Sequence, residues 1–257
     1  IELVRRAAEV AGATDPVVPW PAELPDALAV GELPDGDHGV VIGVADHPQR
    51  QRRVPLALDP GDDVTLLVGA PGAGHHDALV TSAVQLVRAH TPDDLHVYGI
   101  DALGHGLAAI ADAAHVGAIA TRDDATALRI LTHLTREVEI RRGGALGRPD
   151  IAVLVLGLDR LFLHGEGSVS PLLAPLTTLA NEAAGTGVRL ICSGSHAMLT
   201  NRIGVLAARR LVFRAHDALD YPPTVPRAQR AQLTVPMRCA DSASGLVAQI
   251  AHPGDAA

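Results

Sequence analysis

A glycine-rich segment directly after a short apolar run constrains this chain more than any other feature. Residues 64–68 read Val-Thr-Leu-Leu-Val, and residues 69–76 read Gly-Ala-Pro-Gly-Ala-Gly-His-His. The glycine spacing fits G-x-x-x-x-G-K-[ST], a strand-to-helix loop whose backbone N–H groups hold phosphates. The sequence therefore predicts a phosphate-type loop with these nucleotide-site residues: Gly69, Gly72, Ala73, Gly74, His75 and His76.

The charged part of this motif is missing. His75 stands where the motif has lysine, and His76 stands where it has the magnesium-binding hydroxyl. The chain contains no lysine at all. We therefore expect binding of ATP and Mg²⁺ to be weak or lost, and hydrolysis to be poor. A plain glycine-rich turn without any ligand is the alternative interpretation.

Apolar runs alternate with helix-length segments from residue 63 onward. Together with the phosphate-type loop, this order predicts an α/β fold of the P-loop NTPase type, with a mostly parallel sheet and helices on both of its faces. Expected strands are 64–68, 95–100, 116–120, 151–156, 188–192, 211–213 and 246–250. Expected helices are 74–90, 103–111, 123–142, 170–184 and 198–209.

The first 35 residues differ from the rest. A short amphipathic helix is followed by five prolines, whose spacing prevents a continuous helix or a central strand. We interpret residues 1–35 as a helix and proline-rich linker wrapped on the domain, and residues 36–257 as one P-loop domain. Two β-type runs, 40–44 and 54–58, predict an N-terminal hairpin before the loop strand.

Two polar positions follow apolar strands at the expected carboxyl edge of the sheet. Asp159 comes after the run 151–156, where nucleotide-hydrolysing domains place a magnesium-binding acid. Pairing with Arg160 or with a neighbouring helix explains Asp159 equally well. Ser193 stands where a side chain could sense a γ-phosphate, although small polar residues also end buried strands as helix caps.

Composition excludes several classes of function. A formal net charge of −8 and 2% aromatic residues argue against a nucleic-acid partner, because few cationic side chains are left to neutralise phosphates and few aromatic rings to stack on bases. Thirteen histidines show no metal-ligand spacing, so we expect no metal site. Two cysteines suit a reducing compartment, and no apolar run spans a bilayer, so we expect a cytoplasmic segment without direct membrane contact.

Further segments resemble a known family. Residues 97–101 read Val-Tyr-Gly-Ile-Asp, residues 104–107 read Gly-His-Gly-Leu, and residues 115–123 read His-Val-Gly-Ala-Ile-Ala-Thr-Arg-Asp. Together with the opening hairpin and residues 187–190 and 209–214, they resemble the FtsK/SpoIIIE ATPases, specifically the EccC-like tandem domains of type VII secretion. The departures from the family pattern are His75, His76 and Arg160.

This resemblance implies a RecA/FtsK-like fold and a hexameric motor in which one domain hydrolyses ATP. Domains with decayed loops regulate that active domain or recognise the C-terminal signal of a secreted substrate. We therefore expect a degenerate ATPase domain whose partners are other ATPase domains of the same chain or ring and a substrate signal peptide. An active DNA translocase domain and a structural spacer of the ring are the alternatives. Arg209 and Arg210 either reach a neighbour's nucleotide or stabilise a helix C-terminus.

Overall fold

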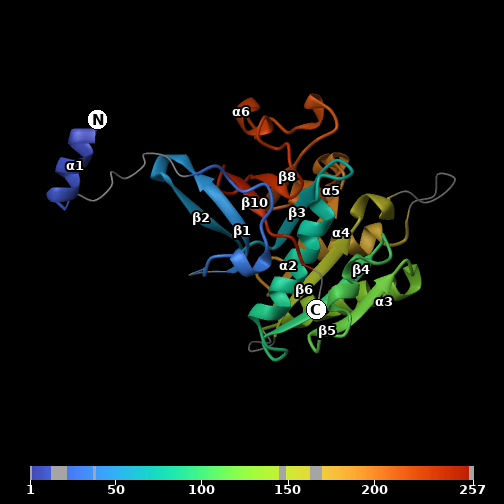
Figure 1. The fold of residues 1–257 in the computed structure, drawn as a ribbon. Coiled ribbons are helices and arrows are strands. Elements are labelled where there is room, and N and C mark those ends of the chain that lie inside the picture. The colour runs from blue at the N-terminus through green and yellow to red at the C-terminus, as the bar shows by residue number, and fades with distance from the viewer. Residues whose placement is uncertain (1, 13–21, 37–38, 145–148, 163–169, 255–257) are drawn as a thin grey trace.

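A computed structural model describes residues 2–12, 22–36, 39–144, 149–162 and 170–254 (Figure 1). Within them the strands form a single ten-stranded sheet in the order β2-β1-β10-β9-β8-β3-β7-β6-β4-β5. The strands are β1 Val40–His47, β2 Arg52–Leu58, β3 Val64–Val68, β4 Leu95–Asp101, β5 Val116–Thr121, β6 Asp150–Leu156, β7 Val188–Gly194, β8 Arg209–Phe213, β9 Arg238–Asp241 and β10 Val247–Ile250.

Helices cover both faces of the sheet, as the alternating pattern predicted. The α-helices are α1 Glu2–Val10, α2 His75–Ala89, α3 Asp124–Arg142, α4 Leu173–Glu182, α5 Arg202–Leu206 and α6 Arg227–Arg230. One apolar core lies under α3 and α4, and a second lies under α2 on the opposite face. None of the helices in the described ranges has the length and apolarity that crossing a bilayer requires.

The strands from β8 to β5 are all parallel, whereas β2, β1, β10 and β9 add an antiparallel half. The predicted hairpin is confirmed as the antiparallel pair β1 and β2. The P-loop α/β class is confirmed as well. Because β3 lies in the middle of the sheet, the loop that follows it is enclosed by strand ends on both sides.

Part of the N-terminal segment lies on this sheet. The Arg238 side chain donates hydrogen bonds to the carbonyl oxygens of Leu24 and Pro25, at 3.1 and 2.7 Å. Leu28 is buried, and its carbonyl oxygen accepts the N–H of His252 at 2.8 Å. Helix α1 stands apart from the sheet (Figure 1), and residues 13–21 lie outside the described residues. The division at residue 35 stays a prediction.

The helix predicted over 198–209 is wrong. A 3₁₀ turn, His196–Thr200, and the short helix α5 take its place, and strand β8 begins at Arg209. Asn201 interrupts the helix because its side chain accepts the N–H of Gly204 at 2.7 Å, which is the bond of a new N-cap. Asparagine is more favourable at an N-cap than in a helix interior, because its side chain bonds nearby backbone groups.

Two smaller expectations also need correction. The segment expected as a helix over 103–111 is a 3₁₀ turn, Gly106–Ile110. The buried Asp101 carboxylate accepts the N–H groups of Leu103, Gly104 and Leu107. These bonds fix the segment that leads into the 3₁₀ turn. Strand β9 lies between residues 213 and 246, where four prolines, Pro222, Pro223, Pro226 and Pro236, predicted an irregular segment.

Neither expectation for Arg209 is correct. Its side chain is buried in β8, where Nε and Nη2 donate to the two carboxylate oxygens of Asp241 in β9, both at 2.9 Å. Asp62 lies 3.3 Å from Nη1 of the same side chain. Arg209 therefore joins three segments of this chain and is not available to a neighbour. Arg210 donates to the carbonyl oxygen of Gly204 in α5, at 2.9 Å.

Candidate functional site

The predicted phosphate loop lies where the sequence placed it, between β3 and the N-terminus of α2. Gly72 and Gly74 have φ values of 74° and 87°, the left-handed region that glycine adopts without strain. A methyl group at Gly74 would come within 2.6 Å of the backbone nitrogen of Met237. The glycines are therefore required by the path of the loop and by the segment that packs against it.

Three distant segments hold the loop in place. The N–H of Gly69 donates to the carbonyl oxygen of Gly194 at 3.2 Å, and the N–H of Ala70 donates to that of Arg214 at 2.8 Å. The N–H of Met237 donates to the carbonyl oxygen of Ala73 at 3.0 Å. These bonds bring the ends of β7, β8 and β9 onto the loop. Nothing in the sequence near residue 237 signalled this contact, which joins positions more than 160 residues apart.

The rings of the two histidines of the loop pack against each other, tilted by 42°. Their ring centroids are 3.9 Å apart, and the ring of His75 also lies 6.2 Å from that of Phe213. His75 is 4% exposed, and its Nδ1 is buried without a hydrogen-bond partner. A methyl group on Gly69 would come within 2.6 Å of that nitrogen. The His75 ring is therefore folded back onto the first glycine of the loop.

Ser193 lies beside the loop, as predicted. Its Oγ is 2.9 Å from Nδ1 of His76 and accepts the N–H of Gly157 at 3.4 Å. Asp159 is close by, because a methyl group on Gly194 would come within 3.1 Å of its carboxylate oxygen. The structure thus brings together the loop, Ser193 and Asp159. Their roles toward a nucleotide remain predictions.

Burial keeps the histidines of this site neutral. It lowers the pKa of His75 to about 3, with smaller contributions from His76 and His196. Burial also lowers the pKa of His76, against an opposing effect of the Asp159 carboxylate. His196 packs edge-on against Tyr221 at 5.9 Å, and its pKa is lowered by burial as well. The loop therefore carries no cation at its lysine position.

The stability of the domain should fall in mild acid because His75 resists protonation. Below pH 6.5 the unfolded chain binds a proton at this residue, whereas the folded chain stays neutral down to about pH 3. Between pH 6.5 and pH 5, His75 should cost about 2 kcal/mol of unfolding free energy. Urea titrations of wild type and His75→Leu at both pH values check this. An equal loss in the two proteins would contradict it.

The fold of the His75 ring onto Gly69 can be tested by a double-mutant cycle. Gly69→Ala should lower the free energy of unfolding by about 1–3 kcal/mol, since the new methyl group meets the imidazole. In a His75→Ala background the same change should cost less than half as much, because the ring is gone. Additive effects in urea unfolding would show that the two residues do not touch.

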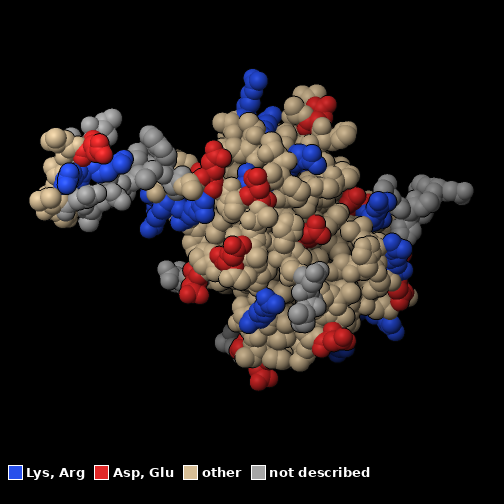
Figure 2. All heavy atoms as spheres, viewed as in Figure 1, with Lys and Arg blue, Asp and Glu red and all other residues tan. Residues whose placement is uncertain are grey.

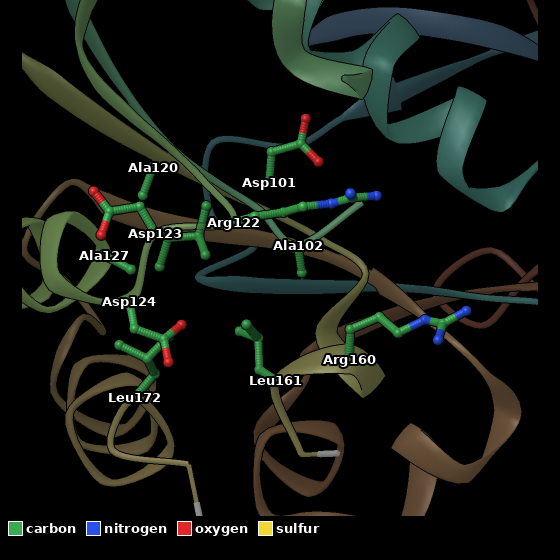
Figure 3. Close-up of a pocket in the computed structure, with 11 residues that line it drawn as sticks. Asp101, Ala102, Ala120, Arg122, Asp123, Asp124, Ala127, Arg160, Leu161 and Leu172 are labelled. Atoms are coloured by element: carbon green, nitrogen blue, oxygen red, sulfur yellow. The ribbon is translucent and has the colours of Figure 1, made fainter. Parts of the chain in front are cut away.

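A separate hollow lies further along the carboxyl edge, at the ends of β4 and β5 (Figure 3). It has a volume of about 260 Å³, and both acidic and basic side chains line it. The carboxylate of Asp123 is occupied in capping α3, where it accepts the N–H groups of Ala125 and Thr126. Asp101 is likewise occupied by backbone N–H groups. The basic residues that line it are Arg122 and Arg160, and Arg122 donates to the carbonyl oxygen of Leu103.

Other ligand chemistries find little support in the described residues. No group of three or more histidine, cysteine, aspartate or glutamate side chains there could hold a metal ion. Cys192 and Cys239 are both buried, and burial raises the pKa of the Cys192 thiol to about 12. On the face shown in Figure 2, arginines are dispersed among acidic side chains and form no continuous basic field.

A comparison of this sequence with models of protein families identifies its family. The sequence model of the FtsK/SpoIIIE family matches residues 37–203, which include the hairpin, the loop and strands β3 to β7. The chain belongs to the FtsK/SpoIIIE family. The resemblance inferred from the Tyr-x-x-Asp and His-Val-Gly segments is thereby confirmed.

Relatives within this family are secretion proteins. The ESX-3 secretion system protein EccC3 of Mycobacterium tuberculosis is 30% identical over 201 residues, which cover 70% of this chain and 15% of EccC3. The ESX secretion system protein EccC of Thermomonospora curvata is 38% identical over 91 residues, or 35% of this chain and 7% of that protein. The chain thus spans a small part of the length of these relatives.

Solved structures of related proteins share the fold. The cytoplasmic domain of the type VII secretion ATPase EccC from Thermomonospora curvata superposes with a TM-score of 0.76 at 24% identity, covering 93% of this chain and 32% of that one. ATPases 2 and 3 of the same EccC, in complex with a signal sequence peptide, superpose with a TM-score of 0.72 at 19% identity, covering 93% and 45%. At these identities the likeness establishes the fold alone.

Proposed function

We propose that this chain is a non-hydrolysing ATPase-like domain of an EccC-type secretion motor. The observation that carries the proposal is the histidine pair at the phosphate loop. The His75 ring, neutral and 96% buried, stands in place of the lysine and lies against Gly69. A triphosphate needs cations and open N–H groups at this point. The residues present do not fit Mg-ATP, which is why the proposed domain does not hydrolyse it.

A domain without turnover can still act in a motor. It can favour one arrangement of a neighbouring active domain, or it can hold the substrate while the neighbour hydrolyses ATP. We propose these two roles, regulation of a neighbouring ATPase domain and recognition of a secreted protein's C-terminal signal. They are supported by the EccC relatives and by the neighbour structure whose ATPases 2 and 3 hold a signal sequence peptide. We place the domain on the cytoplasmic side of the membrane, as in the neighbour structure of a cytoplasmic domain.

A hydrolysis assay tests the catalytic part of this proposal. Phosphate release from Mg-ATP by the purified chain should equal that of a blank, and His76→Ala should leave it unchanged because no catalytic group is lost. Turnover that rises in proportion to chain concentration and persists through further purification would contradict the proposal. The regulatory part is tested by adding the chain to its parent motor's active domain, whose turnover should then change.

A further inference from the structure

The segment before the sheet is fastened to it by few contacts. Of residues 22–33, which we call the strap, only Leu28 is buried, at 6% exposure. Leu28 packs with Val44 and Ala251 in a cluster of three buried residues, separate from the two main cores. Segments with so little buried apolar area open locally while the rest of a domain stays folded. The strap can therefore leave the sheet without unfolding it.

Arg238 of β9 fastens the strap to the sheet. Its side chain is buried, and its Nη2 donates to the carbonyl oxygens of Leu24 and Pro25 in the strap. The Asp26 carboxylate lies 3.3 Å from the same nitrogen. The Nε atom donates to the Gln249 side chain in the neighbouring strand β10, at 3.0 Å. A buried guanidinium that loses its acceptors is costly, so Arg238 should turn toward solvent when the strap leaves.

Met237, the residue before Arg238, is held in a strained conformation against the phosphate loop. Its φ is 65°, a left-handed value that is uncommon for residues other than glycine. Its N–H donates to the carbonyl oxygen of Ala73 at 3.0 Å, and its carbonyl oxygen accepts the N–H of Ile250 at 2.9 Å. Such a conformation persists only where the surrounding structure enforces it. Because freeing Arg238 removes part of that enforcement, Met237 then gains a relaxed conformation in which its bond to Ala73 is lost.

A second set of contacts leads from the strap to helix α2. The carbonyl oxygen of Leu28 accepts the N–H of His252, just after β10, at 2.8 Å. The preceding residue, Ala251, is buried, and its carbonyl oxygen accepts the hydroxyl of Thr81 in α2 at 2.6 Å. Thr81 is itself buried and lies less than two turns after His75, where α2 begins. The strap is thus connected both to the phosphate loop and to the helix that follows it.

We propose that the strap controls the phosphate loop. With the strap in place, Met237 and Ala251 hold the loop and the first turns of α2. When the strap is lifted, Met237 relaxes and the loop loosens around the ring of His75. The physical basis is a residue with two conformations, one of which the strap favours. Any contact that draws residues 22–33 off the sheet acts on the loop in this way, whether or not the loop binds a nucleotide.

Amide hydrogen exchange of the full chain, followed by NMR, tests the proposal. Leu28→Asp should release the strap, because it places a carboxylate in the apolar cluster. The amide of His252 reports this release and that of Met237 reports the loop, and both should exchange at least about tenfold faster than in wild type. Ala27→Asp adds the same charge at the exposed neighbouring residue and should leave both rates near those of wild type. Fast exchange at His252 with an unchanged rate at Met237 would overturn the proposal.

A reversible lock tests the same link without a new charge. Ala29 in the strap and His252 after β10 form an isolated bridge, and both are exposed. Paired strand residues lie within reach of a disulfide, so cysteines at these two positions should lock the strap when oxidised and free it when reduced. Met237 should exchange at least about fivefold more slowly in the oxidised form, and when reduced it should exchange faster than Leu154 of the buried strand β6. An unchanged rate at Met237, or a reduced form in which Met237 and Leu154 exchange equally, would contradict the proposal.

Discussion

Replacing Arg209 with methionine is expected to lower the free energy of unfolding by about 3–5 kcal/mol. The guanidinium makes two 2.9 Å hydrogen bonds with the carboxylate of Asp241, which is 2% exposed. Burial raises the pKa of Asp241, but the hydrogen bonds and charge of Arg209 outweigh it and hold the pKa below its usual value. Methionine would leave a buried carboxylate without its cation. Urea unfolding at pH 7 measures the loss.

Two further variants separate charge from packing. Arg209→Met combined with Asp241→Asn should be more stable than Arg209→Met alone, because the amide keeps an acceptor and removes the unpaired charge. Arg210→Met is the matched neighbour: its partner is the carbonyl oxygen of Gly204, so it should cost no more than about 1 kcal/mol. An Arg209→Met protein within about 1 kcal/mol of wild type would refute the argument.

Restoring the missing cation should restore part of nucleotide binding. The double variant His75→Lys with His76→Thr recreates the lysine and hydroxyl of the motif and removes the imidazole that lies against Gly69. A charge-assisted hydrogen bond contributes about 1.5–3 kcal/mol, so Mg-ATP should bind roughly 10- to 100-fold more tightly than to wild type. Equilibrium dialysis with labelled ATP measures both affinities.

A single variant serves as the control for this experiment. His76→Thr alone supplies the magnesium-binding hydroxyl but no cation, so its affinity for Mg-ATP should stay near that of wild type. Thermal unfolding without nucleotide should accompany the binding data, since a folded double variant is required. A folded double variant that binds Mg-ATP no better than wild type would show that the histidines are not what excludes nucleotide.

The central sheet was predictable because its strands are fully buried. Parallel strands covered on both faces read as continuous apolar runs, and β3, β6 and β7 all do. Strand β9 is equally buried, but it was missed because it is not a continuous apolar run. Its Arg238 and Asp241 are buried but paired with partners remote in sequence, and a local pattern does not contain that information.

The candidate site also contains residues that the sequence could place and residues that it could not. The glycines, His75 and His76 could be placed from the loop motif, and Ser193 from the strand that precedes it. His196 and Met237 could not, because they reach the loop only where the chain leaves β7, beside β3, and where it enters β9, two strands away from β3. The ring position of His75 also depends on these contacts. Tertiary contacts, and not the loop sequence alone, therefore decide whether a side chain occupies the phosphate loop.

Calorimetric titration of the purified chain with Mg-ATP tests the central claim most directly. The neutral, buried His75 predicts no saturable heat up to about 1 mM nucleotide, both with Mg²⁺ and without it. A one-to-one, magnesium-dependent binding isotherm in the micromolar range would contradict the claim, because it would mean that the histidine loop still holds a triphosphate.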